Sequence, residues 1–171
     1  MRNSKVGLGG GCHWCTEGVF QSLKGITSVE QGWIASAPPN EAYSEAVIVC
    51  YNPNIISLKD LIEIHLHTHS ATSRHSMRDK YRSAIYTYGS AQSKICENIL
   101  HDLQPSFDNE LVTEVLMVKN FKINQPEFLN YYYSNPNKPF CKNFIEPKLR
   151  LVLEKFSKVV NHAKFKATGN L

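Results

Sequence analysis

GGGCHWC, residues 9–15, joins a short apolar run to a stretch with helical periodicity, and so fixes the first strand–helix unit of the fold. Three consecutive glycines permit a tight turn and let a ligand approach the backbone closely. Cys12 stands in the first turn of the expected helix, where unpaired backbone N–H groups favour negative charge. A cysteine in that position has a lowered thiol pKa, and the thiolate is its reactive form. The stretch therefore predicts that Cys12 is a nucleophilic or redox-active cysteine.

Cys12 and Cys15 also form a C-x-x-C pair, which is typical of dithiol redox motifs and of half of a zinc site. The sequence has no second pair of this kind, so a zinc site would have to borrow histidines, namely His65, His67, His69 and His75. We expect these histidines at the surface or at a helix end, and predict no metal site. The order of elements after the pair does not resemble that of thioredoxin. Zinc binding and disulfide exchange are kept as alternatives.

The remainder of the chain mixes strands and helices without strict alternation, which predicts an α+β domain with helices covering one sheet. Strands are expected over residues 6–10, 29–35, 46–51, 81–88 and 112–118, and helices over 12–23, 57–68, 91–103, 126–133 and 149–160. Ser57 and Asp60 have the spacing of a helix N-cap with a carboxylate reaching back from three positions on. We expect one domain over residues 1–171, with a core from about residue 5 to 160 and a frayed tail.

Composition and charge exclude several classes of protein. A chain of 171 residues that is 42% hydrophobic and 20% charged is long and apolar enough for one globular domain. The net charge of +4 comes largely from lysines spaced along the last third, which we interpret as a solvated face and not as a nucleic-acid surface. The first residues lack the apolar core of a secretory signal, and no apolar run is long enough for a membrane span. We expect a cytoplasmic monomer.

Six segments resemble, in the same order, the A-type peptide methionine sulfoxide reductases. GCHWCTE at residues 11–17 resembles the family's Gly-Cys-Phe-Trp signature, which is followed by a glutamate five residues after the cysteine. The other similar segments are Gly32-Trp33, residues 44–53, residues 56–69, YRSAIY at 81–86 and residues 135–141. The resemblance implies a ferredoxin-like two-layer sandwich with a mixed or antiparallel sheet. It also implies cofactor-free, thiol-dependent reduction of methionine-(S)-sulfoxide, free or in proteins, as in the repair of oxidised proteins.

The same resemblance assigns catalytic roles. Cys12 is expected to attack the sulfoxide sulfur, Glu45 to donate the proton, and Tyr81 to hydrogen-bond the sulfoxide oxygen. Glu45 precedes a buried apolar run, where removal from water favours the protonated carboxyl. From the residues alone, Glu45 would be interpreted as a surface residue at a strand start and Tyr81 as an ordinary strand tyrosine.

The reaction leaves Cys12 as a sulfenic acid, which a second thiol condenses into a disulfide. The family carries a resolving cysteine where Cys141 stands, in a segment rich in Pro and Asn that we expect to be a mobile loop. Cys15 is the alternative resolving cysteine, because the first turn of a helix can permit a bridge. Cys50 and Cys96 are expected to be structural. Thioredoxin, or a similar dithiol, would then reduce the disulfide.

Several positions depart from the family pattern. His13 replaces a phenylalanine that forms the methyl pocket together with the tryptophan at Trp14, and Trp33 replaces a tyrosine that lends a hydroxyl to the sulfoxide oxygen. Ser76 and Phe128 stand where the family has an aspartate and often a histidine. We predict weaker binding of the methyl group or a shifted substrate preference. A thiol sensor of the same fold and a zinc-binding or partner-binding module are therefore retained as alternative functions.

Overall fold

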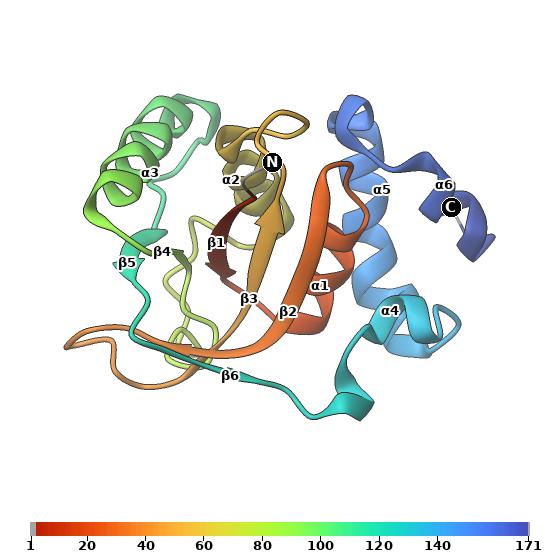
Figure 1. Ribbon diagram of the computed structural model, residues 1–171, viewed down its shortest axis with the longest axis horizontal. Helices are drawn as coiled ribbons and strands as arrows, with labels where there is room; N and C mark the ends of the chain where they lie inside the picture. The colour runs from red at the N-terminus through yellow and green to blue at the C-terminus, as the bar shows by residue number, and fades with distance from the viewer. Residues whose placement is uncertain (1–2, 171) are drawn as a thin grey trace.

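The computed structural model describes residues 3–170 as one six-stranded sheet with helices packed against it (Figure 1). The strands lie in the order β5-β4-β1-β3-β2-β6, and every neighbouring pair is antiparallel except β4 and β5, which are parallel. Their bounds are β1 Ser4–Gly9, β2 Ile26–Ala35, β3 Ser44–Tyr51, β4 Ala84–Thr87, β5 Glu114–Met117 and β6 Asn120–Ile123. The mixed sheet confirms the predicted α+β class.

The helices are α1 His13–Gln21, α2 Leu58–Thr68, α3 Ser90–Leu103, α4 Tyr131–Ser134, α5 Glu146–Lys155 and α6 His162–Thr168. Helix α1 packs on β2 and β3, α2 contacts α1 and α3, and α5 contacts α1 and α2. The main core lies between these helices and one face of the sheet, and includes Leu8, Val47 and Phe20. A smaller apolar cluster around Ile34, Ile48 and Tyr86 lies separately from it.

The start of α2 follows from local sequence. The Ser57 side chain accepts a hydrogen bond from the Asp60 amide at 3.0 Å, and the Asp60 carboxylate accepts one from the Ser57 amide at 3.1 Å. These two bonds pair backbone donors that a helix N-terminus otherwise leaves without partners, which confirms the predicted cap. The helix ends at Thr68, so that His69 follows it beside the loop that carries Cys12.

The C-terminal third differs from the prediction. Cys141–Ile145 forms a helical segment with Cys141 fully buried, so the expected loop is wrong. The predicted final helix begins earlier, at Glu146, and residues 162–168 form α6 in place of a frayed tail. Phe165 of α6 is buried in the core, which explains why this end is ordered. The predicted domain also includes residues 1, 2 and 171, which lie outside the described residues.

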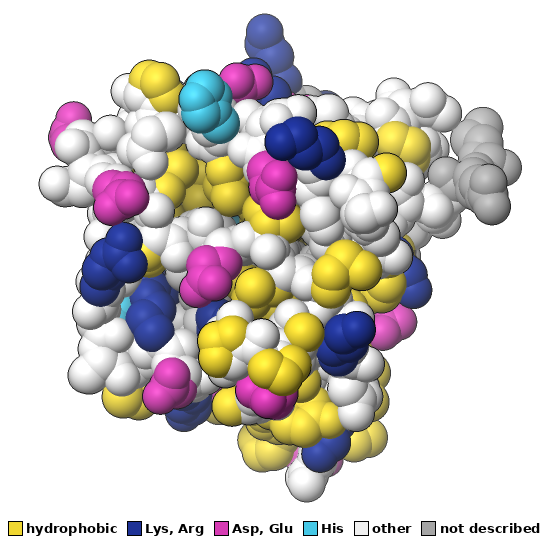
Figure 2. All heavy atoms as spheres, turned by 90° about the vertical axis from the view of Figure 1, so that its left-hand side faces the viewer, with side chains coloured by type: hydrophobic (Ala, Val, Ile, Leu, Met, Phe, Trp, Pro, Cys, Tyr) yellow, Lys and Arg dark blue, Asp and Glu magenta, His cyan; other side chains and the backbone are white. Residues whose placement is uncertain are grey.

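The surface of the described chain carries mixed charge on the side of α3 and β5. Figure 2 shows acidic and basic side chains interspersed on that face. Within residues 3–170, none of the helices is both long enough and apolar enough to cross a membrane.

Candidate active site

Cys12 lies at the junction between β1 and α1, as the glycine run predicts. It is the N-cap of α1, and its carbonyl accepts the first helical hydrogen bonds from the amides of Cys15 at 3.1 Å and Thr16 at 3.2 Å. A Cβ added at Gly10 would lie 2.4 Å from the ring of His69, so only glycine fits there. The loop at Gly10 therefore contacts the His69 ring directly, and this contact determines the path of the backbone leading to Cys12.

The two cysteines of the C-x-x-C pair have opposite electrostatic characters. A hydrogen bond from the Cys15 thiol, aided by the backbone amides of Trp14 and Cys15, lowers the pKa of Cys12, although burial and the charge of Glu45 oppose this. The same hydrogen bond, together with burial, raises the pKa of Cys15. Cys12 is half-buried and Cys15 is buried. Cys12 is therefore the thiol suited to act as the nucleophile, whereas the neighbouring Cys15 stays protonated.

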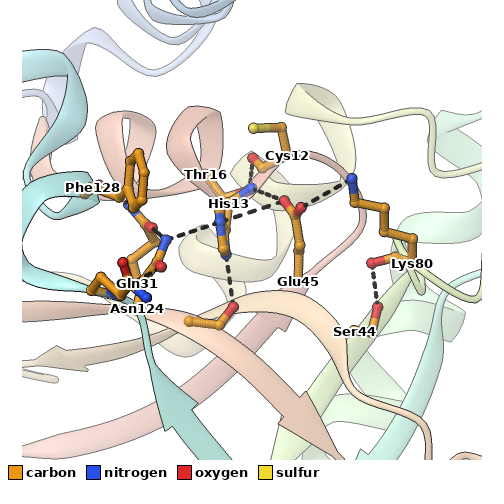
Figure 3. Close-up of polar contacts among 11 residues, drawn as sticks. Cys12, His13, Thr16, Gln31, Ser44, Glu45, Lys80, Asn124 and Phe128 are labelled. Atoms are coloured by element: carbon orange, nitrogen blue, oxygen red, sulfur yellow. Dashed lines mark hydrogen bonds and ion pairs between the residues drawn. The ribbon is translucent and has the colours of Figure 1, made fainter.

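Glu45 lies at the start of β3, next to the N-terminus of α1 (Figure 3). Its Oε2 atom accepts a hydrogen bond from the backbone amide of His13 at 3.0 Å. Its Oε1 atom lies 3.7 Å from the ammonium nitrogen of Lys80, and the Glu45 side chain is only 9% exposed. The fold thus brings Cys12 and Glu45, which are far apart in the sequence, to one site.

A cavity of about 390 Å³ opens beside Cys12 and is lined by Gly10, Gly11, Cys12, His69, Ser70, His75, Met77, Tyr81 and Lys148. Tyr81 therefore shares the cavity with Cys12. A hydrogen bond with Tyr81, followed by the charges of Tyr81 and Glu45, raises the pKa of Lys80. Lys148 is one of the lysines of the last third that the sequence places on a solvated face. It instead lines this cavity and donates a hydrogen bond to the Thr68 carbonyl at the end of α2.

Trp14 belongs to an aromatic cluster that does not line this cavity. Its ring stacks on Tyr131 with centroids 4.0 Å apart and planes 2° apart, and it meets Phe140 edge-on at 5.4 Å. Phe128 lies 6.0 Å away at a shallow angle. Glu17 holds Tyr131 in this position, because its buried carboxylate accepts hydrogen bonds from the amides of Asn130 and Tyr131 at the start of α4.

His13 and Trp33 pack together behind Glu45. Their ring centroids are 5.2 Å apart, and His13 is 3% exposed whereas Trp33 is half-buried. The Nδ1 atom of His13 lies 2.7 Å from the Gly32 carbonyl, and its Nε2 atom lies 3.7 Å from Oε2 of Glu45. Neither residue lines the 390 Å³ cavity. The imidazole therefore contacts the predicted acid.

The remaining cysteines lie at different depths. Cys141 is fully buried with its sulfur 3.6 Å from the Asn135 carbonyl, and burial raises its pKa. It is close enough to Cys15 for its charge to raise the pKa of that thiol. Cys96 is buried in α3, and Cys50 is half-buried in β3.

Two of the histidines weighed as zinc ligands, His65 and His69, lie at the C-terminal end of α2, which is one of the two expected positions, but they are buried or half-buried and not at the surface. His65 is 1% exposed with Nε2 2.9 Å from the Gly9 carbonyl, and burial lowers its pKa to about 4. His69 stacks on His65 at 4.2 Å, and its Nε2 atom lies 2.8 Å from the Ser83 hydroxyl. Over residues 3–170, no cluster of three or more His, Cys, Asp or Glu side chains is placed to hold a metal ion.

Sequence reasoning missed Lys80, Tyr131, Phe140 and Asn124, which contact the predicted residues. Lys80 immediately precedes Tyr81, and that adjacency was the available signal. Tyr131 and Phe140 belong to an aromatic-rich segment, but nothing local indicates that both pack on Trp14.

Comparison with known proteins gives a consistent result. The family model described as peptide methionine sulfoxide reductase matches residues 4–160. A peptide methionine sulfoxide reductase MsrA of Polynucleobacter asymbioticus is 30% identical over 169 residues, covering 90% of this chain and 89% of that protein. Reduced Mxr1 from Saccharomyces cerevisiae has a similar fold, with a TM-score of 0.70, 24% identity and coverage of 82% and 90% of the two chains. Mxr1 in complex with Trx2 gives a TM-score of 0.61 at 23% identity, covering 72% of this chain and 82% of that chain.

Proposed function

Because this chain belongs to the peptide methionine sulfoxide reductase family, and is therefore an oxidoreductase that reduces methionine sulfoxide with thiols, we propose that Cys12 is its nucleophile. The observation that carries this proposal is the position of Cys12 at the N-terminus of α1, with a hydrogen bond from Cys15 that lowers the pKa of Cys12. A thiolate is the reactive form of cysteine towards an electrophilic sulfur.

The first step transfers oxygen from the substrate to Cys12. The Cys12 thiolate attacks the sulfoxide sulfur, the sulfoxide oxygen takes up one proton, and the oxygen passes to the cysteine sulfur. The sulfoxide is thereby reduced by two electrons to methionine, and the sulfur of Cys12 is oxidised by two electrons to a sulfenic acid. Glu45 supplies the proton, and the Tyr81 hydroxyl orients the oxygen in the cavity next to Cys12. The substrate is methionine-(S)-sulfoxide, free or in a protein.

The methyl group of the substrate is held by aromatic surface beside Cys12. Trp14, stacked on Tyr131 and bordered by Phe140, offers a ring face on which a thioether methyl can pack. Contacts between sulfur and aromatic rings contribute about 0.3–1.5 kcal/mol. Trp33 packs against the ring of His13, which precedes Trp14 in the sequence, and so contributes to this site indirectly.

The sulfenic acid is resolved in two stages. The Cys15 thiol, already hydrogen-bonded to Cys12, condenses with it to form a disulfide and releases water. Cys141 then exchanges with Cys15, which requires the segment around Cys141 to move because its sulfur is fully buried. A thioredoxin-like dithiol reduces the final disulfide, by analogy with yeast Mxr1, which was crystallised with Trx2. The odd number of cysteines is in keeping with a reducing, cytoplasmic compartment.

A single-turnover experiment tests this sequence of disulfides. Reduced protein is mixed with methionine-(S)-sulfoxide without a reductant, quenched by alkylation and mapped by mass spectrometry. We expect a Cys12–Cys15 disulfide first and a Cys15–Cys141 disulfide later. In Cys15→Ser, a trapping reagent for sulfenic acids should label Cys12. Direct formation of a Cys12–Cys141 disulfide in wild-type protein would contradict the proposed order, and Cys50→Ser is the matched control.

A further inference from the structure

One arginine side chain joins separate parts of the wall of the 390 Å³ cavity. Arg78 is half-buried in the loop between α2 and β4. Its Nη1 atom donates hydrogen bonds to the Gly10 carbonyl at 3.1 Å and to the Tyr81 carbonyl at 3.0 Å. Its Nε atom donates to the Ser73 carbonyl at 2.9 Å, and Nη2 donates to the Ser70 carbonyl. A single guanidinium therefore binds four backbone carbonyls.

The carbonyls that Arg78 binds belong to the part of the chain that surrounds the nucleophile. Gly10, Ser70 and Tyr81 line the cavity together with Cys12, and Gly10 stands two residues before Cys12. Because Nη1 bonds Gly10 and Tyr81 at once, one nitrogen atom connects the loop of the nucleophile to the tyrosine. Within the part of the chain that the structure describes, no other hydrogen bond joins residues 10–12 to residues 70–81.

The other bonds around Tyr81 come from its own loop and from β3. The Tyr81 amide donates to the Met77 carbonyl at 2.9 Å. The Lys80 carbonyl accepts bonds from the Glu45 amide and from the Ser44 hydroxyl, both at 2.9 Å, and Figure 3 shows the bond to Ser44. These bonds tie the residues beside Tyr81 to β3 but not to the loop before α1. The direct connection to that loop is therefore the Arg78 guanidinium.

This arrangement of donors requires the chemistry of arginine. The guanidinium is planar and always protonated, and it carries five N–H donors in fixed directions, whereas lysine carries its donors on one nitrogen atom. Among the described residues, no carboxylate forms an ion pair with Arg78. Its charged donors are therefore used on backbone carbonyls, and such charge-assisted bonds are about twice as strong as neutral ones.

We propose that Arg78 is a positioning residue that keeps the Tyr81 hydroxyl in register with Cys12 by joining their two loops through Nη1. The inference rests on the proposed role of Tyr81 in orienting the sulfoxide oxygen. Loss of Arg78 leaves the nucleophile itself reactive, because the groups that lower the pKa of Cys12 are Cys15 and the amide of Trp14. The sulfoxide oxygen, however, is no longer held where it takes up its proton. A misplacement of about 1 Å can reduce a rate by about a hundredfold.

A double-mutant cycle on kcat/KM for methionine-(S)-sulfoxide tests the proposal with Arg78→Met and Tyr81→Phe. Methionine replaces the aliphatic stem of arginine and has no donor. We expect Arg78→Met to lower kcat/KM by about tenfold or more in the wild-type background, but by less than about threefold in Tyr81→Phe, because an absent hydroxyl cannot be misplaced. An equal loss in both backgrounds would show that Arg78 supports the fold only, and would overturn the proposal.

Alkylation of Cys12 separates positioning of the oxygen from a change in the nucleophile. The pH midpoint of alkylation by iodoacetamide should be the same in Arg78→Met and in wild type, since only the thiolate reacts. A shift of this midpoint large enough to explain the loss of kcat/KM would overturn the proposal, because Arg78 would then act on the Cys12 thiol.

The matched control is Arg74→Met, which makes the same exchange in the same loop. Arg74 is exposed and pairs with the exposed Glu110 at 3.3 Å, so this variant should keep the kcat/KM of wild type. A loss in Arg74→Met equal to that in Arg78→Met would count against a specific role of Arg78 and overturn the proposal.

A second variant keeps the test decisive if Arg78→Met does not fold. Arg78→Lys retains the charge and the stem but cannot reach four carbonyls from one nitrogen atom, so it should show the same coupling to Tyr81→Phe with a smaller loss. Wild-type kcat/KM in Arg78→Lys would overturn the proposal. If Tyr81→Phe keeps wild-type kcat/KM, the proposed role of Tyr81 itself fails; if Tyr81→Phe is slow and the two losses multiply, only the role of Arg78 fails.

Discussion

Replacing Cys15 with alanine tests whether the second cysteine sets the reactivity of the first. The hydrogen bond from Cys15 makes the largest contribution to the lowered pKa of Cys12, and burial and the charge of Glu45 both act against it. A hydrogen bond to a charged group contributes about 1.5–3 kcal/mol. Loss of that hydrogen bond in Cys15→Ala should therefore raise the pKa of Cys12.

The assay is alkylation of Cys12 by iodoacetamide as a function of pH, quantified on the peptide that carries Cys12. Cys15→Ala should move the midpoint to higher pH and slow alkylation at neutral pH by about tenfold or more, since only the thiolate reacts. Cys15→Ser keeps an O–H donor and should show a smaller shift. A midpoint in Cys15→Ala equal to that of wild type would refute the electrostatic role of Cys15.

Three further predictions concern the support of the site. Burial lowers the pKa of His65 to about 4 from an ordinary value of 6.5, so between these pH values the unfolded state binds more protons than the folded state. The free energy of unfolding should therefore fall by about 3 kcal/mol as the pH drops from about 6.5 to about 4, which urea titrations check. If the free energy of unfolding of His65→Asn depended on pH as steeply as that of wild type, this prediction would be contradicted. Glu17→Gln leaves one of the two backbone amides without an acceptor, because the amide nitrogen of glutamine can only donate. It should lower the free energy of unfolding by about 1–3 kcal/mol in urea titrations, whereas wild-type stability would refute this anchoring role. Gly10→Ala places a Cβ 2.4 Å from the His69 ring and should reduce kcat/KM in a folded protein by about tenfold or more, with partial recovery on adding His69→Ala; wild-type kcat/KM in the single variant would count against the contact.

Local signals account for the parts of the fold that the sequence predicts well. The glycine run before Cys12 and the Ser57–Asp60 cap each act within a few residues, and the structure has a helix starting at both places. β6 was not predicted because Asn120–Ile123 is an edge strand of only four residues that is mostly exposed. Its two apolar residues, Phe121 and Ile123, do alternate with polar ones, but the run is too short to indicate a strand by itself. The expected strand over 81–88 shortens to Ala84–Thr87, because the Arg82 amide bonds to the Ser44 hydroxyl from another strand.

The site could not be predicted in full from local sequence, because it depends on contacts between residues far apart in the chain. Cys12 was predicted from the glycine run and the helix start, and Glu45 from the resemblance, but their proximity depends on the packing of α1 beside β3. His13 was expected to line the methyl pocket, whereas its polar partners come from β2, β3 and the residue after β6. Lys80 reaches Glu45 because the Glu45 amide bonds to the Lys80 carbonyl at 2.9 Å, a pairing that no local pattern indicates.

The most direct test of the account is turnover of a mixture of both methionine sulfoxide epimers with dithiothreitol, comparing wild type with Cys12→Ser. The account predicts that wild type consumes only the S epimer and that Cys12→Ser consumes neither, while remaining folded by circular dichroism. Turnover of the S epimer by Cys12→Ser at the wild-type rate, or none by folded wild-type protein, would contradict the assignment of Cys12 as the nucleophile of a working reductase.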